Sequence, residues 1–172
     1  MGIFGNIFGK EETNAALEIE RKFLVTGDFK AFSTGKFDII QGYLSTDSER
    51  TVRVRIASDQ AFITIKGASD ETGTTRFEWE QSISVNDAKA LLKLCLEHPI
   101  EKTRYIVEIE EFIFEVDEFK GANQGLIIAE VELSDPTDEI PTPEWMGQEV
   151  TNDARYYNSY LSQHPYSQWN DQ

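Results

Sequence analysis

The chain has 172 residues, which is enough for one domain with a substantial core. Its formal net charge is -15, so it repels nucleic acid and anionic membranes at long range, and neither is an expected partner. Cys95 is the only cysteine, so no intramolecular disulfide can form, which fits the reducing conditions of the cytoplasm. No apolar run approaches the roughly 20 residues that span a bilayer.

Residues 1–16 differ in composition from the rest of the chain. The first ten are rich in glycine, phenylalanine and isoleucine and lack both a basic start and a cleavage site, so they do not resemble a secretory signal. Two interpretations stand: a flexible extension, or a weak apolar docking segment. We therefore expect an N-terminal extension over residues 1–16 and a single domain over residues 17–172.

Alternation of apolar and charged residues predicts β-strands along most of this domain. The expected strands cover residues 17–25, 37–45, 51–56, 61–66, 75–83, 100–109, 112–119 and 126–133. Between them, Ser84 and Asp87 have the spacing of a helix start, and leucines at helical spacing continue that helix up to Pro99. Residues 134–143 form an expected loop, and residues 144–161 contain one or two short helices. The sequence thus predicts a mainly β (α+β) domain with about eight antiparallel strands.

Each expected strand has one charged face and one apolar face, because successive side chains point to opposite sides. The charged members are Glu18, Glu20, Lys22, Arg53, Arg55, Lys66, Arg76, Glu78, Glu80, Lys102, Arg104, Glu108, Glu115, Asp117, Glu130 and Glu132. An ordinary sheet with one face in water gives the same alternation, so a plain β domain is one interpretation. The abundance of full charges and the grouping of like signs on single strands favour a ligand between them.

About eight antiparallel strands can close into a barrel that holds one small ligand. If the charged faces point inward, the interior is a water-filled tunnel, and the apolar faces point outward, where the helical regions partly cover them. Rows of arginine suit a polyphosphate, and rows of carboxylates suit a hard cation such as Mg²⁺ or Mn²⁺. The expected fold is therefore a closed antiparallel eight-stranded β-barrel tunnel with a few flanking helices.

This ordered pattern resembles the CYTH superfamily, also called the triphosphate tunnel metalloenzymes, over roughly residues 16–161. Glu18-Ile19-Glu20-Arg21-Lys22 is similar to the family's ExExK signature. Other similar segments are Gln41–Leu44, Val52–Arg55, Thr64–Gly67, Phe77–Glu80, Lys102–Arg104, Phe114–Asp117, Ala129–Glu132, Glu149–Thr151 and Arg155–Asn158. The family hydrolyses or cyclises triphosphate compounds inside an eight-stranded tunnel with a divalent metal.

The resemblance implies two sets of site residues. The implied metal ligands are Glu18, Glu20, Glu130 and Glu132, with Asp117 and Glu78 or Glu80 as lesser ones. The implied phosphate ligands are Lys22, Arg53, Arg55, Lys66, Lys102 and Arg104. Tyr43 aligns with a family tyrosine and either shapes the tunnel or simply packs in its strand. Arg155 either closes one tunnel end or lies at the surface.

The leading functional hypothesis is a metal-dependent inorganic triphosphatase that cuts tripolyphosphate into diphosphate and phosphate. It implies Mg²⁺ or Mn²⁺ as cofactor and a cytoplasmic monomer or homodimer. The alternatives are a thiamine or nucleoside triphosphatase, a class IV adenylyl cyclase, and a non-catalytic polyphosphate-binding module. The retention of Glu18, Glu20, Glu130 and Glu132 favours an enzyme over a binding module.

Overall fold

The structure of the protein, a computed structural model, describes residues 15–169. The strands are β1 (Ala15–Val25), β2 (Ser33–Ser45), β3 (Arg50–Ala57), β4 (Gln60–Ser69), β5 (Thr75–Ile83), β6 (Leu96–Ile109), β7 (Phe112–Phe119), β8 (Ile127–Glu132) and β9 (Met146–Glu149). The helices are α1 (Val85–Leu92) and α2 (Asn158–Leu161), with 3-10 turns at Lys30–Phe32, Gly121–Asn123, Ala154–Tyr156 and Tyr166–Gln168. None of the helices in this range is long and apolar enough to cross a membrane.

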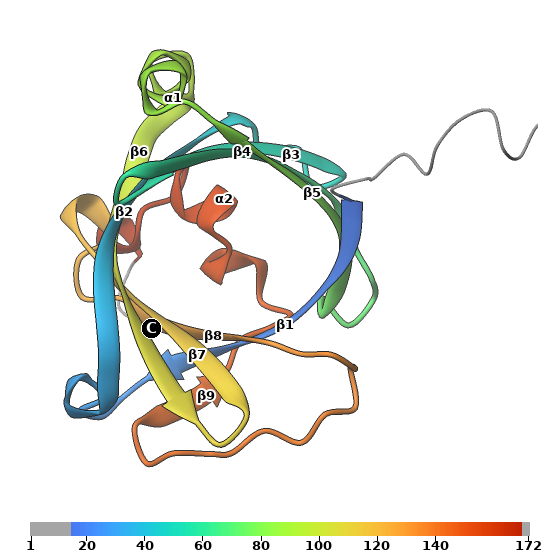
Figure 1. Ribbon diagram of the computed structural model, residues 1–172, viewed down its shortest axis with the longest axis vertical. Helices are drawn as coiled ribbons and strands as arrows, with labels where there is room; N and C mark the ends of the chain where they lie inside the picture. The colour runs from blue at the N-terminus through green and yellow to red at the C-terminus, as the bar shows by residue number, and fades with distance from the viewer. Residues whose placement is uncertain (1–14, 170–172) are drawn as a thin grey trace, which may run out of the picture.

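Eight strands close into one antiparallel ring. The hydrogen-bonded order is β5-β4-β3-β2-β6-β7-β8-β1, and β1 returns to pair with β5 (Figure 1). The short β9 adds to the end of β1. A closed ring has no free edge strand at which another chain could pair. The predicted closed eight-stranded barrel is therefore confirmed, with one additional strand.

Several element boundaries differ from the sequence-based expectation, among them the starts of β2 at Ser33 and of β6 at Leu96, each four residues earlier than predicted. The first strand begins at Ala15, inside the stretch assigned to the extension, and the rest of that extension, including its suggested docking role, lies outside the described residues. The first helix begins as predicted, with the Ser84 hydroxyl accepting a hydrogen bond from the Asp87 N–H at 3.0 Å, but it ends at Leu92. Residues 144–161 contain the expected short helices, the 3-10 turn Ala154–Tyr156 and α2, together with the strand β9, which was not expected.

The early end of α1 has a structural cause. The chain turns after Leu92 so that Cys95 lies against Gly42 of β2, where a Cβ atom would be only 2.8 Å from the Cys95 sulfur. Leu96 then pairs with Tyr43 and Ile100 with Gln41, with a register shift between them. Pro99 therefore lies within an irregular part of β6, where a residue without an N–H is tolerated, and does not terminate the helix.

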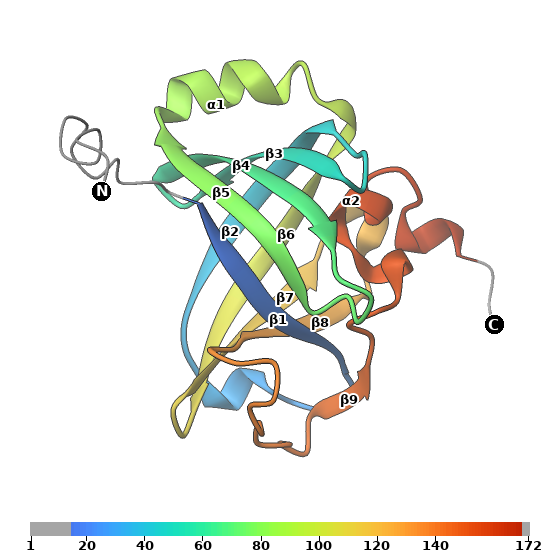
Figure 2. The same ribbon diagram turned by 90° about the vertical axis from the view of Figure 1, so that its right-hand side faces the viewer.

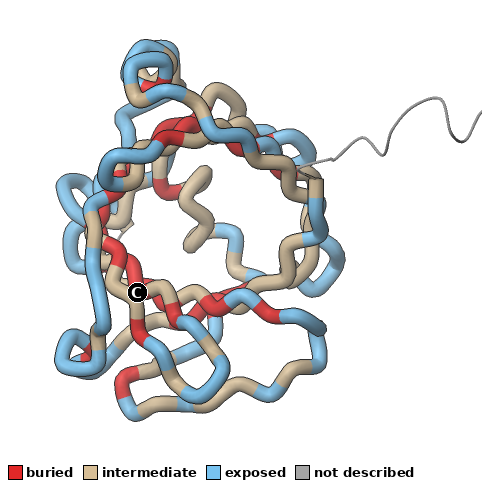
Figure 3. Tube along the Cα trace, in the orientation of Figure 1, coloured by how far each residue is buried: buried red, intermediate tan, exposed pale blue. Residues whose placement is uncertain are grey.

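The apolar packing lies mainly on the outside of the barrel. Outward-facing Phe114 and Val116 pack with Phe29 and with Trp145, which immediately precedes β9. The Phe114 and Trp145 rings meet edge to face, with centroids 5.6 Å apart. On another part of the wall, α1 covers the outer faces of β3 and β4. Burial of each such side chain stabilises the fold by about 1.5–3 kcal/mol, so these coverings allow the charged faces to point inward. Figure 3 shows the buried residues concentrated in the barrel wall and the connecting loops mostly exposed.

One end of the barrel interior is closed by apolar side chains. Ile100, Phe119 and Ile128 have the same alternation as the charged rows of their strands, so they share the inner face. They form a cluster with Leu161 of α2. The C-terminal helices accordingly lie at one end of the barrel (Figure 2) and overlap its interior in the view along the tunnel (Figure 1).

Candidate active site

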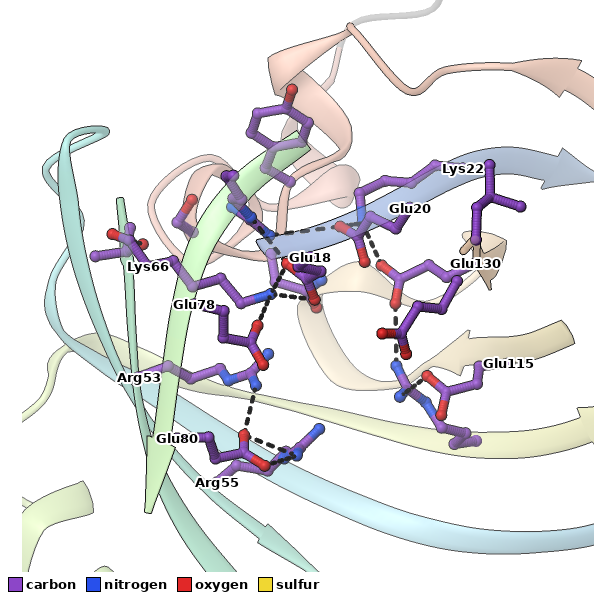
Figure 4. Close-up of a pocket in the computed structure, with 18 of the residues that line it drawn as sticks. Glu18, Glu20, Lys22, Arg53, Arg55, Lys66, Glu78, Glu80, Glu115 and Glu130 are labelled. Atoms are coloured by element: carbon purple, nitrogen blue, oxygen red, sulfur yellow. Dashed lines mark hydrogen bonds and ion pairs between the residues drawn. The ribbon is translucent and has the colours of Figure 1, made fainter. Parts of the chain in front are cut away.

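The barrel encloses a cavity of about 560 Å³. Its lining has seven basic side chains and eight acidic ones, which are Lys22, Arg53, Arg55, Lys66, Arg76, Lys102, Arg104, Glu18, Glu20, Glu78, Glu80, Glu111, Glu115, Glu130 and Glu132. Tyr43 and Thr51 also face it, together with Tyr157, Asn158 and Ser159 from the C-terminal segment. The lining is therefore close to neutral, although the chain as a whole is strongly acidic. Figure 4 shows the charged side chains converging from opposite walls.

The first group of ion pairs joins β1, β4 and β5. The Lys66 ammonium lies 2.7 Å from Glu18 and 2.8 Å from Glu78. The Arg76 guanidinium lies 3.0 Å from the same Glu18 carboxylate and 3.4 Å from Glu20. These pairs form because β1 returns to β5, which places Glu18 opposite Arg76.

A second group joins β1, β8 and β6. Lys22 lies between two carboxylates, at 2.8 Å from Glu20 and 2.5 Å from Glu130. Glu130 also accepts a hydrogen bond from Arg104 at 3.2 Å. Burial by itself would raise the pKa of Glu130, but the charges of Lys22 and Arg104 outweigh burial and hold this pKa well below its usual value. Glu130 is therefore ionised and has two cationic neighbours.

Asp117 lies behind the tunnel lining and supports two of its cations. It is 1% exposed, and its two oxygens accept hydrogen bonds from Arg104 at 2.7 Å each. Lys102 donates to Asp117 at 2.5 Å and to the Asn158 side-chain oxygen at 3.2 Å. Burial lowers the pKa of Lys102 to about 8 despite the attraction of Asp117, and the positive charge of Arg104 adds to the decrease. One carboxylate thus serves two buried cations, and an anion in the tunnel would be attracted to both.

The two arginines of β3 form the third basic group. Arg53 and Arg55 share the carboxylate of Glu80, at 3.5 Å and 3.2 Å respectively. The Nε atoms of both arginines are buried and have no hydrogen-bond partner among the described residues. Burial and the neighbouring Arg53 lower the pKa of Arg55 to about 10. Two adjacent guanidiniums with spare donors are suited to the oxygens of a polyphosphate.

Glu132 differs from the other tunnel carboxylates. It makes no ion pair with any described residue, and it lies opposite Glu20 in the β1–β8 register. Burial raises the pKa of Glu132, and the charges of Glu18, Glu115 and other tunnel carboxylates raise it further. This excess of negative charge is what a divalent cation would neutralise, so the residues on this side of the tunnel fit a metal. Within residues 15–169, however, no three carboxylates already stand close enough together to hold one.

Tyr43 lies in the tunnel wall and is buried, with 5% of its surface exposed. Its hydroxyl accepts a long hydrogen bond of 3.5 Å from the Gln41 amide. Burial raises the pKa of Tyr43, although the cations Arg53 and Arg76 act in the opposite direction. The tyrosine therefore faces the cationic side of the tunnel as a neutral hydroxyl.

The structure brings the implied metal and phosphate ligands to one place, with one exception. All the implied ligands line the cavity except Asp117, which contacts Lys102 and Arg104 from behind. Arg155 pairs with Asp153 at 2.6 Å and lies over the rings of Tyr156 and Trp169, which fits the surface alternative for this residue.

Sequence reasoning left several lining residues out of the implied site. Arg76 and Glu115 could have been found by alternation, since Arg76 lies on the same strand face as Glu78 and Glu115 on the same face as Asp117. Tyr157, Asn158 and Ser159 carried no such signal, because their approach to the tunnel depends on how the C-terminal segment folds back. Glu108, in contrast, shares the alternation but is exposed and accepts a hydrogen bond from the Thr34 hydroxyl at 3.2 Å.

The like charges that are grouped on single strands have partners of opposite sign on neighbouring strands in most of the tunnel. Antiparallel neighbours place a base of one strand beside an acid of the next, as with Lys66 and Glu78 or Arg55 and Glu80. Ion pairs therefore link the strands around the tunnel, and Glu132 is the exception described above.

A closed barrel with this charged interior defines a triphosphate-tunnel type of protein, and the comparison with known families agrees. The CYTH domain family matches residues 16–161, so the chain belongs to the CYTH family. The chain is 45% identical over 156 residues to an inorganic triphosphatase of Acetivibrio thermocellus, covering 90% of this chain and 98% of the relative. It is 36% identical over 152 residues to an inorganic triphosphatase of Nitrosomonas europaea, covering 84% and 96%. A crystal structure of an inorganic triphosphatase matches with a TM-score of 0.58 and 35% identity, covering 84% of this chain and 93% of that one.

Proposed function

We propose that this protein is a metal-dependent inorganic triphosphatase that hydrolyses tripolyphosphate to diphosphate and phosphate inside its tunnel. The observation that carries the proposal is the pair of half-buried arginines Arg53 and Arg55, whose buried Nε atoms have no hydrogen-bond partner among the described residues and which face a tunnel wall rich in carboxylates. The similarity to two inorganic triphosphatases, at 45% and 36% identity over most of each chain, supports the same reaction.

The basic residues bind and orient the phosphate chain. Arg53 and Arg55 have spare donors, and binding of an anion lets them exchange the shared Glu80 for phosphate oxygens. Lys102 and Arg104 approach from the β6 side, held in place by Asp117. Hydrolysis of a phosphoanhydride needs little covalent chemistry from the protein, so this positioning and charge neutralisation provide most of the rate.

The neutral lining explains why a divalent cation is needed. Tripolyphosphate is a multiply charged anion, and a lining of seven bases and eight acids does not by itself compensate that charge. We assign the metal-binding role to Glu18, Glu20 and Glu132, with Glu130, Glu78 and Glu80 as nearby acidic groups, and Mg²⁺ or Mn²⁺ as the ion. When bound, such an ion neutralises phosphate oxygens and makes the phosphorus more open to attack. Asp117 is the weakest member of the implied metal set, because both of its oxygens already accept from Arg104.

Hydrolysis requires that substrate and water enter the tunnel and that two charged products leave it. The apolar cluster around Leu161 closes one end of the interior, so in this proposal substrate enters and products leave through the other end. The single cysteine and the acidic surface are consistent with a cytoplasmic enzyme, acting as a monomer or a homodimer.

The first experiment measures phosphate release from tripolyphosphate, ATP and thiamine triphosphate in parallel, with Mg²⁺, with Mn²⁺ and with chelator. Metal-dependent release that is strongest with tripolyphosphate supports the proposal. Formation of cyclic AMP from ATP without phosphate release would assign the protein to the cyclases. Ligand-dependent stabilisation without turnover would identify a binding module.

Matched variants test the assignment of the arginines. Arg53→Gln should lower kcat/KM for tripolyphosphate by about 100-fold or more, the usual cost of removing a donor that stabilises transition-state charge. Arg50→Gln on the same strand is the control, because Arg50 pairs with Asp47 at the surface and does not line the cavity. Equal activity of the two variants would exclude the tunnel as the active site.

A second pair of variants tests the metal assignment. Glu132→Gln should raise the Mg²⁺ concentration needed for half-maximal activity, since it removes a carboxylate from the acidic side of the tunnel. Glu101→Gln is the control, because Glu101 is exposed on β6 and does not line the cavity. An unchanged Mg²⁺ requirement in Glu132→Gln would move the metal to another set of carboxylates.

A further inference from the structure

One part of the barrel wall is apolar on the outside and has no covering element within the described residues. Leu17 of β1, Phe77 of β5 and Ile65 of β4 are 69%, 47% and 37% exposed. Leu17 and Phe77 lie directly opposite each other in the β1–β5 register, and Ile65 lies opposite Trp79 in the β4–β5 register. We call these four side chains the β1–β5 patch. Figure 2 shows β1, β5 and β4 with α1 above them, β9 below them and no helix in front.

Elsewhere on the outer wall, other segments of the chain cover the outward apolar side chains. Around β6, β7 and β8, outward apolar side chains are covered by Phe29 and Trp145. Over β3 and β4, they are covered by α1. The cover formed by the first cluster extends along β1 as far as Ile19 and does not include Leu17. A contiguous exposed apolar patch on a protein of this kind marks a contact surface.

The chain itself supplies an occupant of matching chemistry. Residues 1–14 precede Ala15, and Ala15 is paired with Trp79, one member of the patch. This segment contains four large apolar residues, Ile3, Phe4, Ile7 and Phe8. Fourteen residues can extend about 46 Å, far more than is needed to fold back over the two neighbouring strands.

We propose that the apolar residues of segment 1–14 dock on the β1–β5 patch and cover it, as α1 and the Trp145 region cover the other faces. The family match begins at residue 16, so segment 1–14 lies outside the matched domain. The proposal is independent of the catalytic assignment, because the patch lies on the outer face and the cavity on the inner one.

Thermal unfolding of full-length variants tests the proposal. Leu17→Ser is the sharpest single change, because a side chain that is 69% exposed should contribute almost nothing to the unfolding midpoint unless something covers it. We expect Leu17→Ser and the double variant Phe4→Ser/Phe8→Ser each to lower the midpoint by about 4–8 °C. The triple variant should fall no further than either, since both changes remove one contact.

Phe32→Ser is the matched control. Phe32 is 62% exposed and belongs to none of the apolar clusters, so its loss should leave the midpoint unchanged. Unchanged midpoints in Leu17→Ser and in Phe4→Ser/Phe8→Ser, or fully additive losses in the triple variant, would overturn the proposal.

Two further measurements separate other occupants of the patch. A dimer mass in light scattering that Leu17→Ser converts to a monomer, while Phe4→Ser/Phe8→Ser does not, would mean that a second copy covers the patch. Sedimentation of the wild type with phosphatidylcholine vesicles, lost in Phe4→Ser/Phe8→Ser, would mean that the segment binds lipid instead. Either result overturns self-docking, whereas a monomer that stays in the supernatant supports it.

Discussion

Replacing Asp117 with asparagine tests the buried charge cluster of the tunnel. Asp117 is 1% exposed, accepts two hydrogen bonds of 2.7 Å from Arg104, and lies 2.5 Å from the Lys102 ammonium. Asparagine keeps the volume of the side chain but leaves both buried cations without their shared negative partner. Removing one partner of a buried ion pair costs about 3–5 kcal/mol, so the free energy of unfolding should fall by about this amount.

The assay is urea unfolding at neutral pH in chelator, without phosphate, supported by thermal unfolding. For a chain of this length, each kcal/mol shifts the midpoint by about 2–4 °C, so the melting temperature of Asp117→Asn should fall by roughly 6–20 °C. Asp38→Asn is the matched control, because the Asp38 side chain is 74% exposed and pairs with Lys120 at the surface. An exposed pair of this kind is worth less than about 1 kcal/mol.

The pH dependence of the effect has a defined sign. Burial alone would raise the pKa of Asp117, but Arg104 and Lys102 outweigh burial and lower this pKa below its usual value. The stability that Asp117 contributes is therefore present above its unfolded-state pKa of about 3.9 and is lost as the pH falls through the lower folded-state pKa. The wild type should lose its advantage over Asp117→Asn only in strong acid.

Two outcomes would refute this reasoning. A loss for Asp117→Asn no larger than that for Asp38→Asn would mean that the cluster is not buried in solution. A gain in stability in the absence of metal would mean that Asp117 is an uncompensated carboxylate, as expected of a metal ligand whose ion is absent.

Three further predictions follow from the same network. Glu132→Gln should raise the thermal midpoint at neutral pH without metal. Burial and neighbouring carboxylates raise the pKa of Glu132, so its ionised form destabilises the folded state, and this stability is regained only as the pH falls. A lower midpoint for the variant would contradict this reasoning. The KM for tripolyphosphate should rise above about pH 8, because burial lowers the pKa of Lys102 to about 8 and the neutral amine attracts phosphate less. Lys102→Arg should flatten that rise. Identical pH profiles of KM for the wild type and the variant would exclude Lys102 as its cause. Leu161→Ala should cost about 2–5 kcal/mol in urea unfolding, because Leu161 is 1% exposed in the cluster that closes the tunnel, and an unchanged midpoint would show that this end is loosely packed.

The strand faces could be predicted from the sequence because alternation is a local property. Val52-Arg53-Val54-Arg55 places its arginines on one face of a strand whatever its neighbours are, and the same holds for Glu130 and Glu132. The count and closure of the strands followed from this alternation and from the family resemblance. The short β9 was missed because four residues, including Gly147, carry no readable period.

Local patterns also misplaced the end of α1. The run from Leu91 to Leu96 has helical spacing, and Pro99 is an expected helix terminator. Packing of Cys95 against Gly42 requires the chain to leave the helix earlier, and Gly42 is far away in the sequence. No local signal contains that contact.

The sequence by itself determined that each strand has one charged face and one apolar face, since the period of two governs each strand separately, whereas closure of the strands into a barrel sets which face points inward. The tertiary structure alone decided which charges meet. Pairing of β1 with β5 and β8, which are distant in the chain, sets Lys22 between two carboxylates and leaves Glu132 opposite Glu20, with no cationic partner among the described residues. Register and closure are long-range properties, so the neutral lining, the buried Asp117 and the excess of negative charge at Glu132 exist only in the folded protein.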